Sequence, residues 1–220
     1  MSDQGQVGKA LALQLEKLGE QVMCIDDAVD AENRARRPEA WEAEGPVQGV
    51  YWLPGLDRES PVREMTLPDW RDATRVRVKL LYTTMRTLYD AVGGPGTFLV
   101  SATRMGGLHG YDEAGAAAPL GGCVTGFTKA FKREKGESLV KAVDFEPGSL
   151  VADLTGKLID EAVEVAFDSD HESMALANIL IDETLNDPGA VEVGYRGGHR
   201  WAIGLEERPA VDGQPGMTLG

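Results

Sequence analysis

The sequence predicts an α/β protein whose parallel sheet carries helices on both faces. Three observations favour this fold: helix-type and strand-type apolar patterns alternate as far as Phe145, Gly or Pro separates most of the segments, and a chain of 220 residues can bury a substantial core. Alternation of this kind implies right-handed crossovers between parallel strands. We therefore expect a doubly wound sheet, closed near the C-terminus by a hairpin-like strand pair.

The first segments begin the alternation. In residues 7–19, VGKALALQLEKLG, apolar side chains recur at gaps of four, four and three, which predicts a helix closed by its final glycine. The run QVMCID at 21–26 predicts a strand. After a polar, helix-like passage at 34–44, GVYWL at 49–53 is a short apolar run of the buried-strand type.

The middle segments continue the alternation of helix and strand. A long helix is predicted from Pro68, where proline fits the first turn, to the stop signal GGP at 93–95. GTFLVSA at 96–102 predicts a strand, Gly121–Glu134 a helix and LVKAVDF at 139–145 another strand. The inner face of the long helix should consist of Leu81, Met85, Leu88 and Val92.

The last third is expected to differ in kind. It predicts helices at 150–167 and 172–185, and then two short strands, VEVGY and RWAIG, on either side of Arg196–His199. Gly197 and Gly198 can supply the positive φ angles of a tight hairpin. We expect one domain over 1–205 and a Pro- and Gly-containing linker over 206–220.

Composition excludes several classes of function. The formal charge of -14, from 22 Lys and Arg against 36 Asp and Glu, disfavours nucleic acid and anionic lipid as partners. The lack of an apolar stretch of bilayer length favours a cytoplasmic protein. Cys24 and Cys123 are expected in the core, without a disulfide, and the scattered His109, His171 and His199 predict no metal site.

A dinucleotide-binding loop is not recognisable. Gly5 and Gly8 could be the second and third glycines of GxGxxG, but Asp3 stands at the first, and almost no chain precedes it to form the strand. Asp26 and Asp27 lie about 20 residues further on, where an acid would hold an adenosine ribose. Without the loop they are weak indications of NAD binding, and solvated loop residues are the simpler interpretation.

Residues 5–145 resemble the short-chain dehydrogenase superfamily through GVYWLPG, TLYDAV, GTFLVSATRMGG and GGCVTGFTKAFKRE, in the family's order. In that family a tyrosine protonates the substrate carbonyl and a lysine four residues later lowers its pKa. These positions fall on Ala117 and Gly121. The family's serine falls on Thr103 or Arg104, and its asparagine near Val78.

No tyrosine of the chain rescues the motif by a shift of register. None has a lysine four residues on. The nearest pair is Tyr82 with Arg86, which lies on the wrong helix, and an arginine holds its proton too tightly to take part in proton transfer at neutral pH. We therefore expect no catalytic and no cofactor-binding residue in this segment. The tyrosines considered are Tyr51, Tyr82, Tyr89, Tyr111 and Tyr195.

One branch of the family shares these absences. The chain is similar to the structural, non-catalytic subdomain of the ketoreductase of type I polyketide and related multifunctional fatty acid synthases. VSATRMGG resembles its "VTRG" strand end, GFTKAFKRE its "GLGRVLALE" helix, and VKAVDFEPG its "GLVDLD" strand. The stretch at 175–205, ending YRGGHRWAIGL, resembles its closing "QVALRGGRRYVPRL" passage, so the likeness covers nearly the whole chain.

The resemblance implies a truncated Rossmann-like half that supports a catalytic half. That neighbour, in the same polypeptide, would bind NADPH and reduce a β-ketoacyl chain on an acyl carrier protein. Two features depart from the pattern: the loop Arg104–Gly122 is long and rich in Gly and Ala, and the first strand is missing or supplied from elsewhere, for example by the partner half. The best candidates for contact with the neighbour are Trp201, Ile203 and the loop Arg104–Tyr111. Core packing is the alternative for Trp201, and Arg104 and Tyr111 are also explained as plain loop residues.

Two rival functions stay open at this point. In a stand-alone oxidoreductase, Tyr111 would give the proton and the Gly5–Gly8 loop would bind NADPH. In the second rival function, the chain is a Rossmann-like binding or regulatory module without catalysis. A TGGxGxxG strand and loop encoded after Gly220, followed by a YxxxN or YxxxK pair, would favour the ketoreductase half over both.

Overall fold

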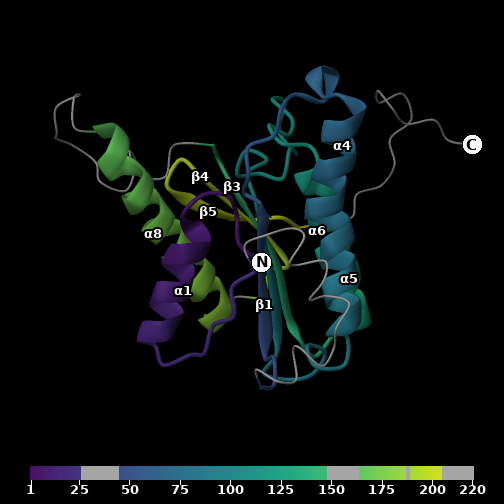
Figure 1. Ribbon diagram of the computed structural model, residues 1–220, viewed down its shortest axis with the longest axis vertical. Coiled ribbons are helices and arrows are strands. Elements are labelled where there is room, and N and C mark those ends of the chain that lie inside the picture. Colours follow the sequence, from purple (N-terminus) through teal and green to yellow (C-terminus); the bar gives the residue numbers. More distant parts are fainter. Residues whose placement is uncertain (26–44, 148–163, 187–188, 205–220) are drawn as a thin grey trace, which may run out of the picture.

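The computed structural model describes residues 1–25, 45–147, 164–186 and 189–204. Its centre is a five-stranded sheet in the order β1-β2-β3-β4-β5, which lies between the two groups of helices in Figure 1. The first four strands run parallel and β5 is antiparallel to β4. The strands are β1 (Gly49–Gly55), β2 (Phe98–Thr103), β3 (Leu139–Phe145), β4 (Glu192–Arg196) and β5 (His199–Ala202).

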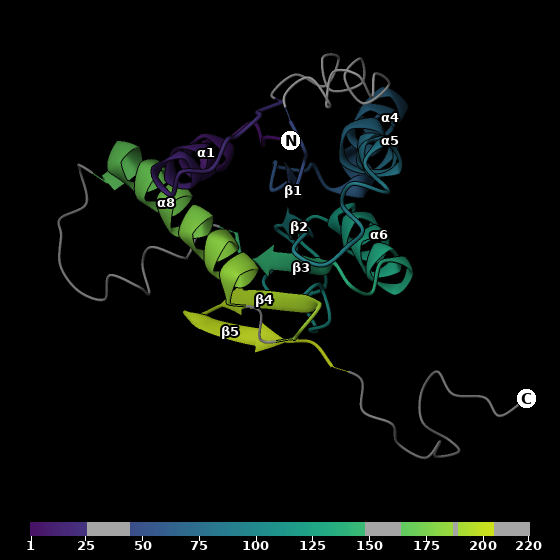
Figure 2. The same ribbon diagram turned by 90° about the horizontal axis from the view of Figure 1, so that it is seen from below.

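Helices cover both faces of this sheet, as predicted. Figure 2 shows α1 (Val7–Lys17) and α8 (Glu164–Leu185) on one face, and α4 (Leu67–Thr74), α5 (Leu80–Thr87) and α6 (Gly121–Glu134) on the other. The predicted α/β fold with a closing hairpin is therefore confirmed. Within the described residues, no helix combines the length and apolar character that crossing a bilayer requires.

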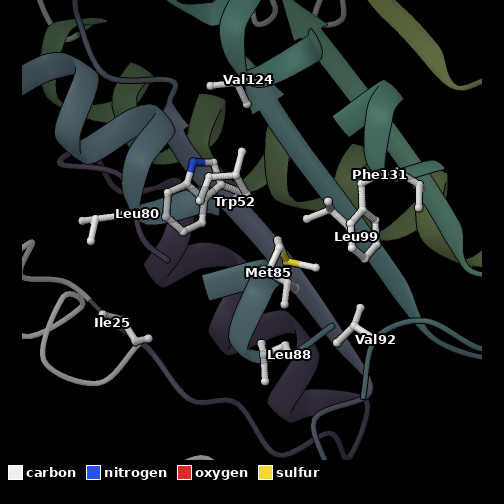
Figure 3. Packing of buried hydrophobic residues seen from close by; sticks show 12 residues of the cluster. Ile25, Trp52, Leu80, Met85, Leu88, Val92, Leu99, Val124 and Phe131 are labelled. Carbon is white, nitrogen blue, oxygen red and sulfur yellow. The ribbon is translucent and has the colours of Figure 1, made fainter. Parts of the chain in front are cut away.

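The sheet divides the core into two layers. On the α5 and α6 face, Trp52 packs with Leu80, Met85, Leu99 and Phe131 (Figure 3). On the α1 and α8 face, the buried residues include Leu11, Leu53, Phe145 and Leu176. Side chains of a strand alternate between faces, so β1 sends Val50 and Trp52 to one layer and Leu53 to the other.

The predicted long helix contains a π-helical turn. The five residues Arg75–Lys79 join α4 to α5. A capping box between Thr66 and Asp69 stabilises the N-terminal end of α4. The buried indole of Trp52 donates to the carbonyl oxygen of Arg77 inside this turn (3.0 Å). All four residues predicted for the inner face are buried, but α5 ends at Thr87, so Leu88 and Val92 lie in the turns that follow the helix.

The two glycines that were predicted to form the hairpin turn do so. Gly197 and Gly198 have φ angles of 57° and 69° and join β4 to β5. Such angles are those of a two-residue turn whose twist matches its strands.

Three expectations need correction. Residues 21–25 are not a strand, because no described neighbour pairs with them along their length; the remaining predicted residues, with Asp26 and Asp27, lie outside the described part. Helix α8 runs from Glu164 to Leu185, so the predicted break near 168–171 does not exist. The helix-like passage at 34–44, the predicted helix over 150–163 and the linker over 206–220 lie outside the described residues. Cys24 and Cys123 are exposed rather than core residues, and Cys123 lies off the buried face of α6.

Candidate functional site

The N-terminal end of α1 already holds a carboxylate. An Oδ1 atom of Asp3 accepts a hydrogen bond from the backbone N–H of Gly8 (2.8 Å). A helix N-terminus is the place where a dinucleotide fold binds pyrophosphate, because unpaired N–H groups and the helix dipole attract anions. Here the protein supplies its own anion, at the position where the fingerprint would require its first glycine.

A second carboxylate lies beside this loop. The backbone N–H of Gln4 donates to Oδ1 of Asp57 (2.6 Å). Burial raises the pKa of Asp57 to about 6, and this outweighs the hydrogen bond from Gln4 and the attraction of Arg77. Two acidic groups therefore lie at the Gly5–Gly8 loop, where an ionised carboxylate would repel a phosphate.

The family's tyrosine and lysine positions carry no reactive side chain, and the lysine position leaves little space for one. Ala117 is exposed, and its N–H donates to the carbonyl oxygen of Met105 (2.9 Å). A Cβ atom on Gly121 would lie 2.7 Å from Cγ of Met105 and 3.3 Å from Cβ of Thr103. The buried thioether of Met105 therefore fills the space from which a lysine would extend.

The family's serine position is part of a structural network. Thr103 Oγ1 donates to Oδ1 of the buried Asp144 (2.8 Å), and the same carboxylate accepts from the backbone N–H groups of Met105 (2.6 Å) and His109 (2.9 Å). Asp144 thus fixes the loop that follows β2. Its hydrogen bonds leave Thr103 turned toward the protein rather than toward a substrate.

His109 anchors the far end of this loop. Its φ angle is 53°, and its ring nitrogens contact Thr125 Oγ1 (3.3 Å) and the carbonyl oxygen of Val193 (2.9 Å). The loop lies so close to β4 that a Cβ on Gly107 would be 2.3 Å from the carbonyl oxygen of Tyr195. Most of Arg104–Tyr111 is therefore packed against its own sheet, and only its end is free to meet a neighbour.

Tyr111 is that exposed end, with 65% of its surface accessible. Its hydroxyl donates to Glu192 (3.3 Å), which also binds Lys129 (2.5 Å). The structure thus brings a phenol and an ammonium group to one carboxylate, which the sequence spacing does not predict. The hydrogen bond with Glu192 raises the pKa of Lys129, so the ammonium group stays charged beside the carboxylate.

A buried ion pair connects β3 to α8 and contacts the hairpin of β4 and β5. Lys141 on β3 and Glu183 on α8 are 1% and 2% exposed and 2.6 Å apart. Glu183 also accepts from Tyr195 and Arg200. Burial alone would raise the pKa of Glu183, but the hydrogen bonds from Arg200, Lys141 and Tyr195 outweigh it and lower the pKa to about 2.

Strand β5 forms an open edge of the sheet. All four of its residues are exposed, and Trp201 has 48% of its surface accessible. Its indole N–H donates only to the carbonyl oxygen of Arg196 (3.4 Å), while Ile203 next to it is half-buried. Core packing therefore does not explain Trp201. An exposed edge strand with a large aromatic side chain is a surface on which another polypeptide can pair.

The other singled-out residues take no part in a site. Tyr82 and Arg86 are exposed on α5, and Val78 is half-buried in the π-helical turn. Within the part of the chain that the structure describes, no group of three or more His, Cys, Asp or Glu side chains is arranged to hold a metal ion.

Known structures resemble this arrangement. A glucose/ribitol-type short-chain dehydrogenase/reductase from Brucella melitensis superposes with a TM-score of 0.57 at 15% identity, over 82% of this chain and 84% of that one. The likeness establishes the fold. A short-chain dehydrogenase from Burkholderia cenocepacia J2315, in complex with NADP, matches with a TM-score of 0.51 at 18% identity, over 80% of this chain and 74% of the other.

A dehydrogenase/reductase from Sinorhizobium meliloti 1021 matches similarly, with a TM-score of 0.52 at 18% identity, over 80% and 72% of the two chains. No protein-family model and no curated protein matches the sequence. The chain thus has a short-chain dehydrogenase-like, Rossmann-like fold at low sequence identity.

Proposed function

We propose that this chain is the non-catalytic supporting half of an NADPH-dependent β-ketoacyl ketoreductase in polyketide or related fatty acid biosynthesis, a cytoplasmic synthase. The observation that carries the proposal is the contact of Met105 with Gly121, because a core side chain occupies the position where the family's lysine would start. The tyrosine position is an alanine on the same loop. Reduction and protonation of a ketone would then take place in the neighbouring catalytic half.

The charge at the N-terminal loop supports the same division of roles. Asp3 takes the anion position at α1, and the half-buried Asp57 adds a second acidic group beside it. NADPH would therefore bind in the catalytic half and not in this chain. The acyl carrier protein would reach this half only as part of the complete ketoreductase.

The role left to such a chain is to stabilise its neighbour. Contacts that exist only when the neighbour is folded stabilise it by mass action. The exposed strand β5, with Trp201, offers an apolar and hydrogen-bonding edge for this contact. Ile203 lies beside it, where its N–H donates to the carbonyl oxygen of Glu192 (3.0 Å).

The first test is to titrate NADPH against the isolated chain while nicotinamide fluorescence is recorded, with a β-ketoacyl thioester added afterwards. We expect neither binding in the micromolar range nor turnover. Micromolar binding with turnover would instead support a stand-alone oxidoreductase that uses Tyr111. Lys129→Ala and Tyr111→Phe would then have to abolish that turnover.

The second test is the coding sequence that continues after Gly220. We expect it to encode a TGGxGxxG loop followed by a YxxxN or YxxxK pair, and the protein made from it to unfold at lower temperature without this chain. If that segment is absent, the chain is better described as an independent binding module.

A further inference from the structure

Strand β5 ends the sheet with an unpaired edge. It is hydrogen-bonded to β4 on one side, and all four of its residues are exposed. Figure 2 shows it at the margin of the sheet, at the opposite end from β1. An edge of this kind offers its free backbone groups to another strand. Among the described residues, no strand takes up that offer.

The register of the hairpin decides which backbone groups of β5 point outward. The N–H of Ile203 donates to the carbonyl oxygen of Glu192 (3.0 Å), which makes these two residues a hydrogen-bonded pair. Along an antiparallel ladder such pairs alternate with pairs that exchange no hydrogen bond. Trp201 therefore turns its backbone groups toward β4, whereas Arg200 and Ala202 turn theirs away from the sheet.

These outward groups are arranged symmetrically about Trp201. One N–H and one C=O lie on either side of it, on Arg200 and on Ala202. A second copy of β5, running antiparallel about a two-fold axis at Trp201, presents the same groups in the opposite order. Arg200 of each copy then exchanges hydrogen bonds with Ala202 of the other. The edge of β5 is thus complementary to itself.

The side chains select the register that is centred on Trp201. In that register the two indoles form a pair without hydrogen bonds, where the Cα atoms approach to about 4.5 Å and the side chains are closest. Trp201 has 48% of its surface accessible, and aromatic cross-strand pairs stabilise a sheet. A slip toward the turn would place Arg200 opposite its own copy, with like charges facing each other. A slip toward Gly204 would separate the two indoles.

Charge does not oppose the approach of a second copy at this edge. The formal charge of -14 makes two chains repel each other wherever carboxylates gather at the surface. Strand β5 contains no Asp or Glu. Its Arg200 is paired with the buried Glu183, and Arg196 at the start of the turn is paired with Asp112. The edge therefore presents little net charge to a copy of itself.

We propose that two copies of this chain pair through β5, antiparallel and about a two-fold axis at Trp201, so that their two sheets become continuous. A four-residue edge buries little surface, and the dimer is therefore weak. The dimer goes beyond the proposed function and does not rest on it. A catalytic half that used the same edge would compete with the second copy, so the two contacts exclude each other in one chain.

Sedimentation velocity of the chain at increasing concentration tests the dimer. We expect the average mass to rise from one chain toward two between about 1 and 300 μM, the range of a small interface. A chain that stays monomeric throughout leaves the edge to a different polypeptide and overturns the proposal. Because the measurement uses no catalytic half, it can fail while the supporting role stands, and the reverse also holds.

Two variants test whether β5 forms the dimer. Ala202→Pro removes an outward N–H but no hydrogen bond to β4, and it should raise the dissociation constant of the dimer at least about tenfold. Trp201→Ala should weaken the dimer by a similar factor without touching the backbone, because it removes the central aromatic pair. Tyr82→Ala, at an exposed residue of α5, is the control and should change nothing. A dimer that survives both β5 variants contradicts the proposal.

Cross-linking tests the register. In a chain with Cys24→Ser and Cys123→Ser, Trp201→Cys places two thiols across the axis, at a Cα separation that a disulfide spans. His199→Cys lies opposite Ile203 of the second copy and should remain reduced. We expect a covalent dimer from Trp201→Cys alone after oxidation at high protein concentration. Equal yields from the two variants, or a higher yield from Tyr82→Cys on α5, would contradict pairing about Trp201.

Discussion

Met105 lies against Gly121 so closely that a Cβ atom on the glycine would be 2.7 Å from the methionine Cγ. The contact joins the loop after β2 to the first turn of α6, and it closes the region where a short-chain dehydrogenase would place its lysine. The packing at Gly121 therefore agrees with the expectation from the sequence that the lysine position carries no catalytic group.

The first prediction tests this packing. Gly121→Ala should lower the free energy of unfolding by about 1–3 kcal/mol, because the added methyl group overpacks a buried contact. Gly122→Ala is the matched control: its Cβ would meet nothing within 4 Å, and alanine favours a helix over glycine. Urea denaturation measures both, and equal effects would show that Met105 does not fill the site.

The second prediction concerns the anion at α1. Asp3→Ala should cost about 1 kcal/mol of stability, because the N–H of Gly8 loses its hydrogen-bond acceptor at the helix N-terminus. Asp3→Asn keeps an acceptor and should cost less. Thermal unfolding compares the two variants. If Asp3→Ala binds NADPH tightly, the loop is a masked cofactor site, contrary to our interpretation.

The third prediction concerns the buried Lys141–Glu183 pair. Glu183→Gln should destabilise the chain by about 3–5 kcal/mol, because it leaves a buried ammonium group without its counter-charge. Adding Lys141→Met to Glu183→Gln removes that charge and should recover most of the loss. A double-mutant cycle in urea measures the coupling, and additive effects would mean that the two groups do not stabilise each other.

The same pair predicts a pH dependence. The pKa of Glu183 is about 2 in the folded chain, below its ordinary value of 4.5, so the unfolded state binds more protons between these values. The stabilisation is complete above about pH 4.5 and is lost as the pH falls toward 2. The difference in unfolding free energy between the native chain and Glu183→Gln should shrink over that window, and a constant difference would contradict this assignment.

The fourth prediction concerns the open edge. Trp201→Ala should change the stability of the isolated chain by no more than about 0.5 kcal/mol, because the indole is a surface group. It should weaken binding of the catalytic half by about 2 kcal/mol, roughly thirtyfold, as expected of a central interface aromatic. Titration calorimetry measures binding. Tyr82→Ala, at an exposed residue of α5, is the control. Equal losses of affinity in the two variants would show that β5 is not part of the interface.

Sequence periodicity predicted the elements whose burial is local and regular. The helical spacing in α1 and α5, the apolar runs of β1 to β3 and the glycines of the hairpin all appear in the structure. Periodicity failed where pairing decides the outcome. Residues 21–25 have the composition of a strand, but a strand requires neighbours on its edges, and a cavity lies between these residues and β1.

The sequence by itself determined the fold class and the lack of a tyrosine–lysine pair, because both depend on residue types at short spacing. Only the tertiary structure decided what replaced that chemistry: Met105 against Gly121, Asp3 at the end of α1, and Glu192 between Tyr111 and Lys129. These contacts join residues that are distant in sequence or separated by loops of irregular conformation, which no periodic pattern encodes. The exposure of Trp201 was decided in the same way, since an edge strand is buried only if another strand pairs with it.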